Sequence, residues 1–278
     1  MKSSLKSVLR PLLLPWAGLW DPVYIGWVRW RTGYQKPIPP IAIRRRKGGS
    51  GADVSWFVKS GRLDAEVFLD AINRHSDRPL AAQTVLDFGA GVGRLLGHFS
   101  GRCADLHAVD VDRMQVEYLS RHFPEVHCQL NSEDPPLRLE SGSVDTVFSF
   151  SVWTHLSFED QMLWLNELWR VLRPNGLALI SIHTESSIDA GMKGSREWQE
   201  ECAPKLAADG FYFTTYTSDG MATLNQKILA QSTPRYGYTV QTEAQVRRVW
   251  GELFNVLEFS ELAFRRHQTL VALRKRSG

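Results

Sequence analysis

Cysteine is scarce in this chain, with three among 278 residues. Cys103, Cys128 and Cys202 are odd in number, widely spaced and form no C-x-x-C pair, which argues against a disulfide framework and against a zinc site. No cluster of histidine and carboxylate side chains has the spacing of metal ligands either. We therefore expect a reducing, cytoplasmic environment and no bound metal.

A strong excess of one charge and a long apolar run are also missing. Lysine and arginine number 33 and aspartate and glutamate 30, a net charge of +3 that is well short of a dedicated nucleic-acid binder. No stretch reaches the ~18 apolar residues that a membrane span needs. The 43% hydrophobic and 23% charged composition predicts one globular domain with appendages, and we expect no nucleic-acid partner.

The N-terminal residues MKSSLKSVLRPLLLPWAGLW begin basic and then turn apolar, as a signal peptide does. Pro11 and Pro15 are expected to break this run, and no small-residue cleavage site follows. Residues 16 to 30 are rich in tryptophan with interleaved arginines. This segment is expected either to pack as a lid on the protein, which we favour, or to lie at a membrane interface.

An irregular connection follows at residues 37 to 53, PIPPIAIRRRKGGSGAD. Its basic residues, Arg44 to Lys47, are expected on a solvated face. We therefore divide the chain into an N-terminal extension, residues 1 to 53, and a main domain, residues 54 to 278. A helix from Ser60 to about Asn73 is predicted to begin the main domain.

From Thr84 onward, strand-like and helix-like segments alternate, which predicts an α/β fold with a mostly parallel sheet. The expected strands are TVLDFG (84 to 89), LHAVD (106 to 110), VHCQL (126 to 130), VDTVFSF and LALISIH. The helix FEDQMLWLNELWRVL lies before the fifth strand, capped by Ser157 and ended by RPNG.

The pattern loosens after the fifth strand, at residues 184 to about 241. We expect an insertion there with one helix around Arg196 to Ala208, and insertions of this kind often cover a ligand. The final strands FNVLEFSE and HQTLVALRK predict an antiparallel edge to the sheet.

The segment VLDFGAGVGRL places a glycine-rich turn after a strand that ends at Asp87. Glycines in such a turn let a ligand lie against the backbone without Cβ clashes. The spacing G-x-G-x-G lacks the last glycine of a nicotinamide fingerprint, and no G-K-[ST] follows as in a phosphate-binding loop. The next strand ends at Asp110, whose carboxylate can accept two ribose hydroxyls, whereas Asp112 is expected to cap the following helix.

These residues resemble the class I, Rossmann-like methyltransferases that depend on S-adenosylmethionine (SAM), with LDFGAGVG as the first motif and Asp110 as the ribose-binding acid. The likeness covers about residues 84 to 183, and the PPL, SVWTHL and RVLRPNG segments are similar to a group of small-molecule methyltransferases. The resemblance implies SAM as cofactor and a Rossmann-like fold with an antiparallel edge strand. The implied cofactor contacts are Asp87, Gly89, Ala90, Gly91, Gly93, Asp110, Val111, Asn131 and Ser151.

Two histidines follow strands at the carboxyl edge of the predicted sheet, where ligands bind in open α/β folds. His183 ends LALISIH and is predicted to act as a general base or to orient the acceptor. His155 follows VDTVFSF, with a hydrogen bond that orders the loop as an equal alternative, and Trp153 in the same loop is a candidate to shape the pocket.

The function that the resemblance implies is methyl transfer to an oxygen or nitrogen of a small molecule, such as a sugar or a secondary metabolite. RNA or protein methylation is the alternative enzymatic reading, although no N-P-P-Y-type tetrapeptide and no RNA-binding module occur. A protein that keeps the cofactor without turnover is a third, because a fold alone does not establish activity.

Overall fold

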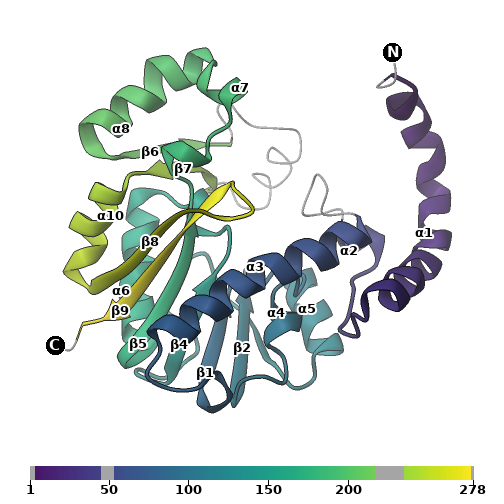
Figure 1. The fold of residues 1–278 in the computed structure, drawn as a ribbon, viewed down its shortest axis with the longest axis horizontal. Coiled ribbons are helices and arrows are strands. Elements are labelled where there is room, and N and C mark those ends of the chain that lie inside the picture. The colour runs from purple at the N-terminus through teal and green to yellow at the C-terminus, as the bar shows by residue number, and fades with distance from the viewer. Residues whose placement is uncertain (1–3, 45–52, 217–234, 277–278) are drawn as a thin grey trace.

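A seven-stranded sheet forms the centre of the computed structural model, which describes residues 4–44, 53–216 and 235–276 (Figure 1). The strand order is β3-β2-β1-β4-β5-β9-β8; β1 to β5 run parallel, and β9 is antiparallel to both β5 and β8. The strands are β1 Thr84–Phe88, β2 Asp105–Asp110, β3 His127–Leu130, β4 Val144–Ser149, β5 Leu172–Ile182, β8 Phe254–Phe264 and β9 Gln268–Lys275. The predicted Rossmann-like fold with an antiparallel edge is confirmed.

Helices cover both faces of this sheet (Figure 1). One face carries α3 Val54–His75, α4 Leu96–Phe99 and α5 Arg113–His122, and the other carries α6 Phe158–Val171 and α10 Glu243–Val249. Successive strand residues point to opposite faces, so Val85 packs in the α3 cluster while Leu86 packs in the α6 cluster. Hydrophobic residues at consecutive positions therefore mark strands buried on both sides.

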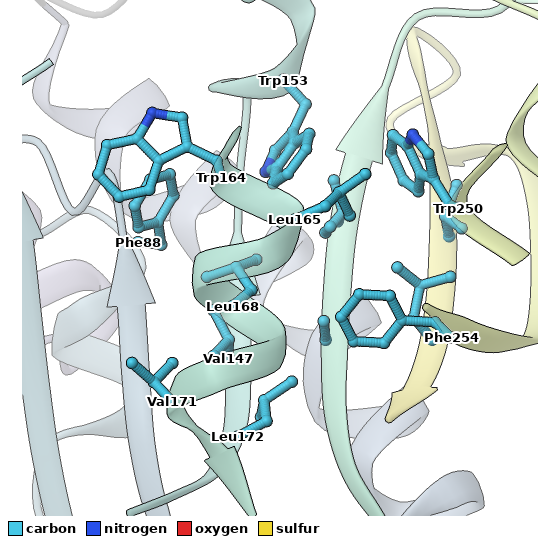
Figure 2. Close-up of a cluster of buried hydrophobic side chains, with 14 of the residues drawn as sticks. Phe88, Val147, Trp153, Trp164, Leu165, Leu168, Val171, Leu172, Trp250 and Phe254 are labelled. Atoms are coloured by element: carbon cyan, nitrogen blue, oxygen red, sulfur yellow. The ribbon is translucent and has the colours of Figure 1, made fainter. Parts of the chain in front are cut away.

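The α6 cluster shows why this helix was the clearest in the sequence. Its residues Trp164, Leu165 and Leu168 are at most 3% exposed and follow helical spacing. Figure 2 shows these side chains against the strands, with Trp250 and Phe254 contributed from near the C-terminus.

Three aspartate or serine side chains cap the main helices. Asp53 accepts a hydrogen bond from the backbone N–H of Trp56, so α3 begins at Val54, six residues before the predicted start. Asp112 accepts from Met114 N at 2.9 Å and Ser157 accepts from Asp160 N at 3.1 Å. The predicted caps of α5 and α6 are confirmed.

The N-terminal region departs from two expectations. Helix α1 spans Ser4–Thr32 without interruption, so the prediction that Pro11 and Pro15 break the run is wrong. A proline removes one hydrogen bond and bends a helix, which does not always end it. Arg44, in the short helix α2 Ile41–Arg44, is 1% exposed and ion-paired with Asp21, so it does not belong to a solvated face.

Burial explains the second correction. Once Asp21 lies beneath the helix it needs a partner, and Arg44 supplies two guanidinium donors to it. The other basic residues of this run, at positions 45 to 47, lie outside the described residues. No helix in the described ranges is long and apolar enough to cross a membrane.

The insertion after β5 lies over the carboxyl ends of the parallel strands (Figure 1). Its elements are α7 Ala190–Lys193, a π-helix Trp198–Cys202, α8 Ala203–Asp209, and an antiparallel pair, β6 Phe211–Thr215 and β7 Gly237–Gln241. The predicted helix is confirmed, whereas the strand pair was not predicted, because 21 residues separate its two halves. Residues 217–234 of the insertion lie outside the described part of the chain.

Short 3-10 turns complete the chain at Leu80–Ala82, Trp153–His155, Glu185–Ser187 and Trp250–Glu252. The RPNG segment belongs to the start of β5, which follows α6 directly, and its pairing with β4 shifts register there. Asn175 has φ +63°, a left-handed conformation that asparagine tolerates better than most residues.

Candidate cofactor and acceptor site

The glycine turn leaves β1 at the carboxyl edge of the sheet and is hydrogen-bonded to β2. The N–H groups of Gly89 and Ala90 both donate to Val109 O, at 2.9 and 3.0 Å. A Cβ at Gly89 (φ +83°) would lie 2.2 Å from Val152 Cγ2, and one at Gly93 (φ +79°) would lie 2.8 Å from Leu119 Cδ2. Packing within the protein therefore requires glycine at these two positions, whether or not a ligand also contacts them.

Asp110 faces the glycine turn, as the sequence predicted. One carboxylate oxygen accepts from Gly91 N at 2.7 Å and the other from Asp112 N at 2.9 Å. The residue is 8% exposed. Each oxygen keeps a further lone pair, so this fixed carboxylate has the capacity for two hydroxyl donors.

The other predicted cofactor contacts surround Asp110. Asp87 is buried at the end of β1, Val111 follows Asp110, and Asn131 N donates to Asp110 O at 3.2 Å. The Asn131 Oδ1 atom is buried and has no hydrogen-bond partner among the described residues. A buried amide oxygen of this kind is suited to an amino donor such as that of adenine.

Ser151 reaches the same edge from the end of β4, in a left-handed conformation with φ +58°. Its N–H donates to Ser181 Oγ at 2.7 Å, and its hydroxyl accepts from Gln268 Nε2 at 3.0 Å. Strained conformations held by several partners cluster at functional sites. The carboxylate, the glycine turn and the Asn131 oxygen together fit SAM.

His183 lies at the end of β5 beneath the insertion, and its ring is 4.9 Å from that of Tyr238. Burial, followed by the charges of His155 and His267, lowers the pKa of His183 to about 3. A group with so low a pKa is a weak base near neutral pH. The structure thus disfavours the general-base half of the prediction and leaves the acceptor-orienting role.

Acid should destabilise the protein through His183. Its pKa is about 3 in the folded state and 6.5 ordinarily, so between these values the unfolded chain binds a proton that the native state does not. Stability is then complete above about pH 6.5 and falls toward pH 3. We expect His183→Gln to flatten the dependence of melting temperature on pH in this window.

The parent protein, measured over the same pH range, is the reference for that measurement. Equal slopes for the parent and His183→Gln would show that His183 titrates normally.

His155 ties the loop after β4 to the insertion. Its Nδ1 is 3.0 Å from Gly237 O and 2.6 Å from the hydroxyl oxygen of Tyr216, and its ring stacks on Tyr236. These contacts favour the loop-ordering interpretation of His155 over a catalytic one.

Trp153 does not shape an open pocket. It is fully buried and packs against Trp250 at 5.2 Å between ring centroids. Its side chain extends from the 3-10 turn Trp153–His155, which follows β4, into the α6 cluster, where its apolar indole surface is buried.

A charged group at the edge was missed from the sequence. Asp64 of α3 is fully buried and accepts from Arg94 at 2.6 Å and from Arg265 at 2.8 Å. Both guanidinium groups also lie over the Trp56 ring, at 5.6 and 5.3 Å. Helical spacing places Asp64 on the same buried face as Phe68 and Ala71, so its burial had a signal in the sequence, but no local pattern relates it to a residue 201 positions away.

Comparison with known proteins agrees with this geometry. Residues 86–180 match the family described as a methyltransferase domain. An uncharacterized methyltransferase of Mycobacterium tuberculosis is 34% identical over 98 residues, 35% of this chain and 39% of that protein. A protein of Mycolicibacterium smegmatis named as a probable S-adenosylmethionine-dependent methyltransferase is 28% identical over 175 residues, 60% of this chain and 65% of that one.

The fold has counterparts among solved structures. The 1,6-didemethyltoxoflavin-N1-methyltransferase of Burkholderia thailandensis superposes with a TM-score of 0.53 at 17% identity, covering 87% of this chain and 93% of that one. The matches to the curated relatives span less than two thirds of their length. Residues 86–180 thus match a methyltransferase domain, and the fold that surrounds them is that of known SAM-dependent methyltransferases.

Proposed function

We propose that this chain transfers a methyl group from SAM to an oxygen or nitrogen of a small molecule. The observation that carries the substrate class is the attachment of the insertion over the carboxyl edge of the sheet. The hydroxyl of Thr239 donates to Leu156 O at 2.6 Å, and Gln241 N donates to His183 O at 3.0 Å. Strand β7 is thereby bonded to the segments that follow β4 and β5 at this edge.

Arg235 extends this attachment toward the cofactor residues. It pairs with Asp134 at 2.6 Å, in the loop that follows Asn131, and with Asp160 at the start of α6. The neighbouring Tyr236 stacks on His155, and its pKa is raised by burial and, to a smaller extent, by the negative charge of Asp110. Aromatic side chains of the insertion that contact His155 and His183 at this edge favour a small acceptor over a folded macromolecule.

Methyl transfer would be carried out by residues 54 to 278, with residues 1 to 53 as an N-terminal extension. Asp110 would hold the ribose, Asn131 the adenine amino group, and the glycine turn would carry the remainder of the cofactor on its backbone. SAM supplies an electrophilic methyl group when bound. His183 and the insertion tyrosines would align the acceptor, and alignment can contribute ~7 to 11 kcal/mol in favourable cases.

Methyl transfer can be followed without knowing the acceptor. Incubating the protein with methyl-labelled SAM and a cell extract should place label in the small-molecule fraction, because the insertion is bonded over the edge of the sheet where SAM would bind. Asp110→Ala serves as the control and should lose most of the label. Label in protein or RNA would contradict the substrate class, and SAM binding without any transfer would contradict the activity.

A further inference from the structure

Helix α1 exposes an apolar stripe to solvent. Of the nine exposed large hydrophobic side chains in the described residues, six belong to this one helix. Trp30 is 82% exposed, Leu19 69% and Trp20 67%. The stripe consists of Leu19, Trp20, Val23, Tyr24, Trp27 and Trp30. Three- and four-residue spacing puts all six on one side of the helix.

The opposite side of α1 is fixed to the protein. Val28 is 1% exposed and packs in a cluster with residues of α3. Asp21 is buried, pairs with Arg44 and also accepts from Ile41 N at 2.8 Å. Because Asp21 and Val28 are seven residues apart, they share one face, and their anchoring turns the tryptophan stripe outward.

Charge is distributed unequally between this region and the remainder of the chain. Residues 1 to 52 hold ten lysines and arginines and a single acidic residue, Asp21. Of the chain's 33 basic and 30 acidic residues, 23 and 29 are then left for residues 53 to 278. The modest net charge of the whole chain therefore conceals a strongly basic N-terminal region beside an acidic main part.

We propose that the α1 stripe docks the protein on a lipid surface that carries anionic headgroups. Tryptophan and tyrosine favour the bilayer interface because their rings combine an apolar body with a polar tip. The excess of basic residues in this part of the sequence is attracted to anionic headgroups. Arg31 already lies over the Trp27 ring at 5.3 Å, so a positive charge stands directly beside the aromatic surface.

A second copy of the stripe is a poorer occupant. Two copies of α1 facing each other would bring two strongly basic segments together, and like charges oppose that contact. An anionic bilayer matches both the charge and the aromatic composition. The inference does not depend on the proposed methylation.

Vesicle co-sedimentation of the full chain tests the inference. We expect binding to phosphatidylcholine vesicles that contain phosphatidylglycerol, weaker binding to phosphatidylcholine alone, and loss of binding as salt is raised. Substituting Trp20, Trp27 and Trp30 together by serine should reduce the bound fraction about tenfold or more, because the apolar anchor is removed.

The matched control substitutes exposed apolar residues on other helices. Met114 and Leu163 are 45% and 47% exposed, and serine at both positions should leave vesicle binding unchanged. A cooperative thermal unfolding transition like that of the parent shows that each variant is folded, and it separates this test from the methylation assay.

Three outcomes would overturn the inference. Undiminished binding by the tryptophan variant would mean that the stripe is not the contact. Equal, salt-independent binding to both vesicles would remove the anionic surface from the proposal. Absence of vesicle binding, with light scattering showing a dimer that the variant converts to a monomer, would identify a second copy as the occupant.

Discussion

Alanine in place of Asp110 is expected to weaken SAM binding by about 1.5 to 3 kcal/mol, the range for a hydrogen bond to a charged group. This corresponds to roughly tenfold to a hundredfold in the dissociation constant. The carboxylate is positioned by Gly91 N and Asp112 N, so its loss also releases the glycine turn. Isothermal titration calorimetry with SAM measures the change, with NAD as a ligand that should not bind.

The neighbouring Asp112→Ala is the matched control. Asp112 caps α5 through Met114 N, so its removal should cost about 1 kcal/mol of stability and leave SAM affinity unchanged. An unaltered dissociation constant for a folded Asp110→Ala protein would reduce Asp110 to a turn residue.

Asp64→Ala is expected to lower the free energy of unfolding by about 3 to 5 kcal/mol, because it leaves buried positive charge without its partner. Arg94 and Arg265 are only 15% and 23% exposed and would face each other across the vacated position. Asp64 joins α3, the glycine turn and the β8–β9 turn, so SAM affinity should fall as well. Urea unfolding measures the stability change.

Helix α3 provides the control for this change. Glu66 pairs with Arg62, but the two side chains are 50% and 61% exposed. Surface pairs of this kind contribute ~0.2 to 1 kcal/mol, so Glu66→Ala should have little effect. Losses of similar size at Asp64 and Glu66 would show that the buried ion pairs contribute no more than a surface pair.

Local pattern was sufficient for the sheet and its helices. The segment TVLDFG, with Val85 and Leu86, was predicted as a strand, and Ser157 predicted the start of α6. These features depend on neighbours within a few residues, so periodicity and capping rules detect them. The continuous helix α1 was missed because the proline rule gives a tendency that neighbouring helix-forming residues can outweigh.

The cofactor half of the site follows the same division. The glycine turn and Asp110 were visible because β1, the turn and β2 are consecutive in the chain. The lowered pKa of His183 could not be predicted from the sequence, because it depends on burial beneath an insertion whose strands pair across 21 intervening residues.

Sequence by itself determined the methyltransferase-like order of elements, the glycine turn and the ribose-binding candidate, all of which are encoded in short spacings. Only the tertiary structure decided that Arg235 bridges Asp134 and Asp160, that Asp64 holds two arginines, and that the α1 tryptophans face solvent. Such contacts join segments far apart in the chain. Their energies depend on burial and distance, which residue spacing does not record.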